Sequence, residues 1–146
     1  MPSASLMATA VLLDTNFLLI PAQFGVDIFA ELDRICAFNY KAVVVEATIS
    51  ELEGIASDKS ASAKDRKAAL LGLQLIKAKG VKVVRPERKV FKSADKAILE
   101  FAVAGNKESH KSVIVATQDK ELRESLRSKG VGVIILRQKQ HLKFYL

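Results

Sequence analysis

A chain of 146 residues is long enough for one domain with a buried core and short for two. Its 49% hydrophobic and 27% charged composition excludes an intrinsically disordered protein, and no apolar run approaches the ~18–20 residues of a membrane-spanning helix. The single cysteine, Cys36, excludes an internal disulfide and a zinc site built from several thiolates. The opening MPSASLMATA lacks the basic start of a secretory signal, so we expect one cytoplasmic domain spanning residues 1–146.

Charge is unevenly distributed along the chain. Residues 1–58 hold two basic and eight acidic side chains, residues 59–92 hold eleven and two, and residues 93–146 hold ten and six. A basic segment beside an acidic one suits a nuclease, because Lys and Arg bind phosphates while carboxylates bind a metal ion. A solvated helix face explains such a lysine-rich run about equally well.

Strand-like and helix-like patterns alternate from the first apolar run onward. The run AVLLD at 10–14 is continuous and apolar, as expected of a strand buried on both faces of a parallel sheet. Helical spacing of apolar residues follows at 26–38, then a strand at 41–46 and a helix through 49–56. The polar stretch SDKSASAKD at 57–65 predicts a loop.

The second half of the chain continues this order. A helix is predicted at 64–79, ended by Gly80, and a strand at 81–84 precedes the basic loop RPERKVFK. The remaining expected elements are a helix from about 93 to 105, a strand at 112–117, a helix at about 119–129 and a strand at 131–136. The alternation predicts a three-layer α/β/α domain with a central, mainly parallel sheet of about five strands.

Four acidic residues lie where a strand-like run ends or a helix begins: Asp14, Glu51, Asp95 and Asp119. In an open α/β sheet such positions gather at the carboxyl ends of the strands. Carboxylates in one crevice repel each other unless a hard cation neutralises them, and oxygen ligands suit Mg²⁺ or Mn²⁺. The pattern therefore predicts a metal-dependent phosphodiesterase.

Each acid also has a simpler explanation. Asp14, Asp95 and Asp119 are suited to capping a helix N-terminus, and Glu51 to a solvent-exposed helix face beside Glu53. Taken singly, these explanations are the stronger ones. Taken together they weaken, because Asp14 ends a strand so apolar that an uncompensated carboxylate would be strongly destabilising there.

Four strings in fixed order resemble those of a known family: LLDTNFLL at 12–19, SELEGI at 50–55, SADKAILEFA at 93–102 and VATQDKEL at 115–122. Together they resemble the PIN-domain nucleases over essentially the whole chain. The closing LRQKQHLKF resembles the tail of archaeal PIN proteins grouped with rRNA-processing nucleases and VapC-type toxins. The resemblance implies a metal-dependent endoribonuclease that hydrolyses RNA phosphodiester bonds.

Carried over by motif, the resemblance assigns catalysis and metal binding, with Mg²⁺ or Mn²⁺, to the four acids named above. Asn16 and Thr117 match positions that shape hydrogen bonding around the family's site. Glu51 rather than Glu53 is the expected helix acid. Relatives often have a second acid where this chain has Lys96, so metal affinity at that corner is expected to differ.

The implied substrate is single-stranded or looped RNA, whose phosphates can follow an exposed basic groove into the site. We expect RNA contacts in the basic loop, at Arg85, Arg88, Lys89 and Lys92. A toxin would have an antitoxin partner, an rRNA processor would join a pre-ribosomal particle, and PIN relatives often form homodimers. One and two metal ions are both compatible with the sequence.

Three other functions fit part of the pattern. A haloacid-dehalogenase-type phosphotransferase also places an Asp after an apolar strand, but usually has a second Asp two residues later, where this chain has Asn16. A two-component receiver domain needs an early acidic pair and a late lysine after a strand. The sequence shows neither feature clearly. A non-catalytic PIN-like RNA-binding scaffold stays open because of Lys96, although the four acids argue against it.

Overall fold

The computed structural model describes residues 8–85, 93–107 and 112–145. Its strands are β1 (Thr9–Leu13), β2 (Tyr40–Val45), β3 (Lys82–Val84), β4 (Val113–Ala116), β5 (Gly132–Arg137) and β6 (His141–Tyr145). Its helices are α2 (Thr15–Leu18), α3 (Ile20–Phe24), α4 (Ile28–Ile35), α5 (Glu46–Ser57), α6 (Ala63–Ala78), α7 (Ala94–Lys107) and α8 (Lys120–Ser128). No helix in these ranges is long and apolar enough to cross a membrane.

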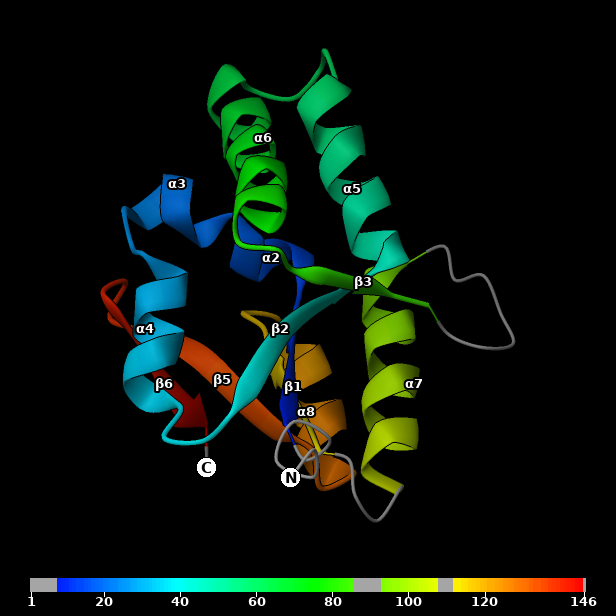
Figure 1. The fold of residues 1–146 in the computed structure, drawn as a ribbon. Coiled ribbons are helices and arrows are strands. Elements are labelled where there is room, and N and C mark those ends of the chain that lie inside the picture. Colours follow the sequence, from blue (N-terminus) through cyan, green and yellow to red (C-terminus); the bar gives the residue numbers. More distant parts are fainter. Residues whose placement is uncertain (1–7, 86–92, 108–111, 146) are drawn as a thin grey trace.

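The strands form one sheet in the order β3-β2-β1-β4-β5-β6 (Figure 1). Every neighbouring pair is parallel except β5 and β6, which form an antiparallel hairpin. The chain leaves β1 toward β2 and β3 and later returns to β4, on the other side of β1. The crevice between β1 and β4 is therefore the topological switch point, where ligands of open α/β sheets bind.

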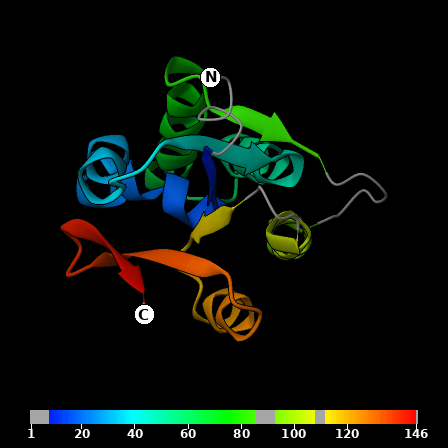
Figure 2. The ribbon, with the colours of Figure 1, turned by 60° about the horizontal axis from the view of Figure 1, so that its bottom comes forward.

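Helices cover both faces of the sheet. α2 to α6 pack on one face around Phe17, Leu32 and Leu52, and α7 and α8 pack on the other around Ile98 and Leu126. Figure 2 shows α4 and α6 on one side of the twisted sheet and α7 and α8 on the other. The prediction of a three-layer α/β domain with a mainly parallel sheet is confirmed.

The sequence missed β6 and the short helices α2 and α3. β6 fully buries only Leu142, so its apolar alternation is too weak to indicate a strand. α2 and α3 have four and five residues and are too short to show helical periodicity. The helix predicted at 26–38 is shorter, running over Ile28–Ile35, and its N-terminal amides are capped by Asp27, which accepts from the amide of Ala30 at 3.0 Å.

A close contact between α2 and α6 fixes the first short helix against the domain. Gly72 on α6 faces Leu18 so tightly that an added Cβ atom would lie 2.9 Å from the Leu18 carbonyl oxygen. Phe17 and Leu18 are fully buried in the same core. α2 is thereby held at the carboxyl end of β1, where the chain carries its first acid.

Candidate active site

The four predicted acids come from four different parts of the fold. Asp14 follows β1 and caps α2, Asp119 precedes and caps α8, Glu51 lies on α5, and Asp95 lies in the first turn of α7. All four line one open cavity of about 240 Å³, together with Thr15, Asn16 and Leu19. The cavity lies at the β1/β4 switch point, and none of its described lining residues is Lys or Arg.

Asp14 is the most buried of these acids, with 5% of its surface exposed. Its Oδ1 accepts from the Thr15 amide at 2.7 Å, and its Oδ2 accepts from the Thr117 hydroxyl at 2.6 Å. Burial raises the pKa of Asp14; the bonds from Thr117 and Thr15 oppose the rise, and the charges of Glu51 and Asp119 add to it. An ionised Asp14 is therefore a site that a cation would stabilise.

Glu51 joins three elements through its two oxygens. Oε1 accepts from the Thr15 hydroxyl on α2 at 2.6 Å, and Oε2 accepts from the Ala94 amide at the start of α7 at 2.9 Å. A carboxylate at a helix N-terminus is also favoured by the helix dipole. Glu53 is exposed and does not line the cavity, so Glu51 is the α5 acid that faces it.

Thr117 links two of the acids. Its hydroxyl donates to Asp14 and accepts from the Asp119 amide at 3.0 Å, and Oδ1 of Asp119 caps α8 by accepting from the Leu122 amide at 3.1 Å. Asn16 supports the loop after β4, because its Oδ1 accepts from the Gln118 amide at 3.0 Å. Asn16 and Thr117, the two residues predicted to shape hydrogen bonding around the site, therefore both form hydrogen bonds in the loop after β4 that positions Asp119.

Asp95 and the predicted basic residues are arranged less tightly. Asp95 is exposed and lies within the first turn of α7 instead of capping it, and the neighbouring Lys96 is exposed and does not line the cavity. Arg85 forms an ion pair with Glu46, with Nε 2.6 Å from Oε2. The other predicted RNA contacts, Arg88, Lys89 and Lys92, lie outside the described residues.

Comparison with known proteins identifies the family of this arrangement. The sequence matches the family described as PIN like domain over residues 11–139. The chain belongs to this family. It is 30% identical to Ribonuclease VapC4 of Methanocaldococcus jannaschii over 132 residues, which are 90% of this chain and 93% of that protein.

Two solved structures share the PIN-like fold. The PIN domain endonuclease Utp24 matches with a TM-score of 0.71 at 19% identity, covering 94% of this chain and 92% of that one. A domain of a functionally unknown protein from Methanocaldococcus jannaschii matches with a TM-score of 0.60 at 18% identity, covering 89% and 92%. At these identities the likeness concerns the fold.

The cavity of this PIN-like domain has the donor chemistry for a hard divalent cation, since its charged lining residues are all carboxylates. Within the described ranges, no three His, Cys, Asp or Glu side chains lie close enough together to hold one ion jointly. Mg²⁺ is commonly bound through only one or two carboxylates and keeps several waters. The cavity of about 240 Å³ has room for such a hydrated ion, because one water occupies about 30 Å³ in the liquid. The residues present therefore fit the ion.

Reasoning from the sequence missed two polar residues of this PIN-like site. Thr15 is buried, lines the cavity and donates to Glu51; the only sequence signal is its place directly after Asp14. Gln118 connects the site to β5, because its Oε1 accepts from the Leu136 amide at 2.9 Å. Nothing in the local pattern around Gln118 indicates this contact.

Proposed function

We propose that this protein is a divalent-metal-dependent endoribonuclease whose active site is the acidic cavity. The observation that carries the proposal is that four carboxylates from four parts of the fold line one cavity. Among the described residues that line this cavity, none is Lys or Arg. Membership of the PIN-like family and similarity to a relative named as a ribonuclease support RNA as the substrate. The proposed compartment is the cytoplasm.

In this proposal, one or two of Asp14, Glu51 and Asp119 would bind Mg²⁺ or Mn²⁺ directly, and the others, with the exposed Asp95 at the rim, would bind it through its waters. The ion supplies Lewis-acid chemistry that activates a water molecule and offsets charge on the phosphate. Thr117 orients Asp14 through the 2.6 Å hydrogen bond, and Thr15 orients Glu51 through another of 2.6 Å. These hydroxyls keep two carboxylates in place despite their mutual repulsion.

A second candidate, the non-catalytic RNA-binding scaffold, rested on Lys96. The Lys96 side chain is exposed and is not part of the cavity lining, so it does not supply the internal cation that a decayed site would use to neutralise its acids. This observation supports the catalytic proposal over the scaffold.

Cleavage of a labelled, partly single-stranded RNA tests the proposal. We expect cleavage with Mg²⁺ or Mn²⁺ and none in EDTA, and restored cleavage when metal is added back. Asp14→Asn keeps the shape of the side chain and removes its charge, so it should abolish turnover in a folded protein. Equal cleavage by carefully purified protein with and without EDTA would refute the metal-dependent mechanism.

The biological role is proposed to be one of two. Similarity to Ribonuclease VapC4 favours a toxin, whose pulldown from the native cell should recover an antitoxin protein. An rRNA-processing nuclease should instead recover ribosomal precursor particles. Light scattering coupled to size-exclusion chromatography tests the proposed homodimer, which should elute with a mass of about twice 16.0 kDa.

A further inference from the structure

The turn between β5 and β6 lies at the same edge of the sheet as the acidic cavity. β5 runs parallel to β4, and Ile134 pairs with Ala116, the last residue of β4. Arg137, three residues beyond Ile134, therefore extends past the end of β4, on the side where Asp119 begins α8. We call Arg137, Gln138, Lys139 and Gln140 the hairpin tip.

Hydrogen bonds connect the cavity to the hairpin tip through the loop after β4. Asn16, which lines the cavity, accepts from the amide of Gln118 at 3.0 Å. The side chain of Gln118 in turn accepts from the amide of Leu136 at 2.9 Å. Leu136 directly precedes Arg137, so the base of the tip is joined to the cavity rim by two successive hydrogen bonds.

A second connection runs along α3. The cavity-lining Leu19 is the N-cap of α3, and Phe24 is its last residue, so the helix spans roughly 7 Å. Nζ of Lys139 lies 5.9 Å from the centre of the Phe24 ring, and the residue Phe24 is 39% exposed. Lys139 and Phe24 thus extend the surface that begins at the cavity, and both are accessible.

The charge of this segment is uniformly basic. No Asp or Glu follows Glu124 in the sequence, whereas Arg127, Lys129, Arg137, Lys139 and Lys143 do. Arg137 and Lys139 are exposed, and within the described residues neither forms an ion pair with a carboxylate. Beside a cavity lined by carboxylates, such cations complement the phosphates that flank the one being cleaved.

The backbone of the tip is not optimised for the turn it makes. Gln138 and Lys139 have positive φ angles of 54° and 57°, and the amide of Gln140 donates to the carbonyl of Arg137 at 3.1 Å. A turn with positive φ at both central residues favours Asn-Gly, because a Cβ atom is disfavoured at positive φ, glycine has none and asparagine tolerates this conformation. Long polar side chains in strained positions are typical of functional surfaces.

We propose that the hairpin tip binds the sugar–phosphate backbone of the RNA strand next to the scissile bond, with Arg137 and Lys139 as the phosphate ligands. The inference rests on the proposed nuclease function, because it concerns the path by which the RNA substrate leaves the acidic cavity. The strand passes from the cavity over α3 or the loop after β4 to the tip. Binding there is insensitive to base sequence, since no base edge is read.

Equilibrium binding of a labelled single-stranded RNA, measured in EDTA over a range of salt concentrations, tests the proposal without cleavage. The test variant is Arg137→Gln combined with Gln138→Asn and Lys139→Gly. Two lost contacts should reduce the slope of log affinity against log salt by up to about 1.4. With equal affinities at 1 M salt, this change in slope corresponds to a roughly 25-fold loss of affinity at about 0.1 M salt.

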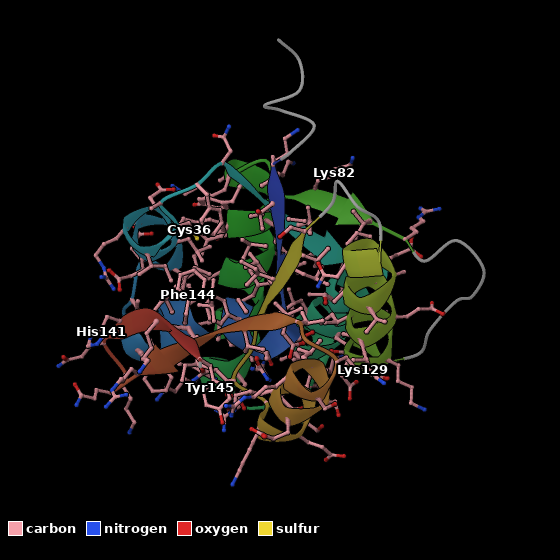
Figure 3. The ribbon with its side chains drawn as sticks, turned by 90° about the horizontal axis from the view of Figure 1, so that it is seen from below. Cys36, Lys82, Lys129, His141, Phe144 and Tyr145 are labelled. Atoms are coloured by element: carbon pink, nitrogen blue, oxygen red, sulfur yellow. The ribbon has the colours of Figure 1, made fainter. Side chains whose placement is uncertain are left out.

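Lys129→Gln is the matched control for Arg137→Gln alone, because each of these variants removes one positive charge, whereas the tip variant removes two. Lys129 follows α8 at the opposite edge of the sheet, and Figure 3 shows it far from His141, which begins β6 beside the tip. This variant should keep the affinity and the salt slope of the original protein. Equal losses in Lys129→Gln and in Arg137→Gln would overturn the assignment to the tip, because they would reflect net charge alone.

Stability measurements separate binding from folding. The Asn-Gly turn suits positive φ, so the tip variant should have a urea midpoint no lower than that of the original protein. If the variant does unfold more easily, Arg137→Gln alone still tests the proposal through a slope reduced by about 0.7. Unchanged affinity and slope in a folded tip variant would overturn the inference, whereas RNA binding without metal-dependent cleavage would instead refute the nuclease function.

Discussion

Replacing Thr117 with valine removes one hydroxyl while keeping the shape of a fully buried side chain. That hydroxyl donates to Oδ2 of Asp14 at 2.6 Å and accepts from the Asp119 amide at 3.0 Å. A hydrogen bond to a charged group contributes about 1.5–3 kcal/mol and a neutral one about 0.5–1.5. We therefore expect Thr117→Val to lower the free energy of unfolding by about 2–4.5 kcal/mol at neutral pH without metal.

The cost should depend on pH in a defined direction. Burial raises the pKa of Asp14, and the Thr117 hydrogen bond opposes this rise, so the variant should have a still higher Asp14 pKa. The loss of stability should be largest where Asp14 is ionised. It should shrink as the pH falls through the raised pKa, because a protonated carboxyl no longer depends on that donor.

Urea denaturation followed by circular dichroism, in EDTA at several pH values, measures this effect. A loss of 3 kcal/mol should also lower Tm by roughly 6–12 °C in a domain of this size. Thr117→Ser is the matched control, because it keeps the hydroxyl. The reasoning would be refuted if Thr117→Val and Thr117→Ser lost the same free energy of unfolding within about 0.5 kcal/mol. It would also be refuted if Thr117→Val cost as much stability in an Asp14→Asn background as in the original protein.

Two further predictions concern Asp14 and Gly72. Asp14→Asn should raise stability at neutral pH in EDTA, because the ionised carboxylate is disfavoured by burial and by the charges of Glu51 and Asp119. The original protein should lose stability as the pH rises above 3.8 toward the raised pKa of Asp14, and the variant should lack this component in urea titrations. Gly72→Ala should cost about 1–3 kcal/mol, because its Cβ would lie 2.9 Å from the Leu18 carbonyl oxygen.

Each of these predictions has a contrary result. A lower stability of Asp14→Asn than of the original protein, at neutral pH in EDTA, would contradict the conclusion that burial of the Asp14 charge is unfavourable. For Gly72, the control is Gly54→Ala on α5, where nothing lies within 4 Å of the added Cβ. That change should be neutral or stabilise the helix by up to about 1 kcal/mol. Equal stabilities of the two alanine variants would show that α2 moves without cost.

The sequence by itself determined the layered architecture and the positions of the acids along it. The buried parallel strands are continuous apolar runs, and the long helices repeat their apolar residues at helical spacing, so both signals are local. Asp14 directly follows such a run and Asp119 lies three residues beyond another, which predicted their place at the carboxyl edge of the sheet. The β6 hairpin escaped detection because its pairing depends on a strained turn instead of a strong apolar pattern.

Only the tertiary structure decided which polar groups meet around these acids. Glu51 and Glu53 are both glutamates and lie two residues apart on α5, so the sequence hardly distinguishes them. The hydrogen bonds of Glu51 with Thr15 and Ala94 do distinguish them. Those contacts span 36 and 43 residues of sequence. Likewise, the ion pair of Arg85 with Glu46 joins separate elements. Periodicity reports the burial of one element at a time, whereas hydrogen bonds and ion pairs depend on how separate elements pack, so no local pattern could reveal them.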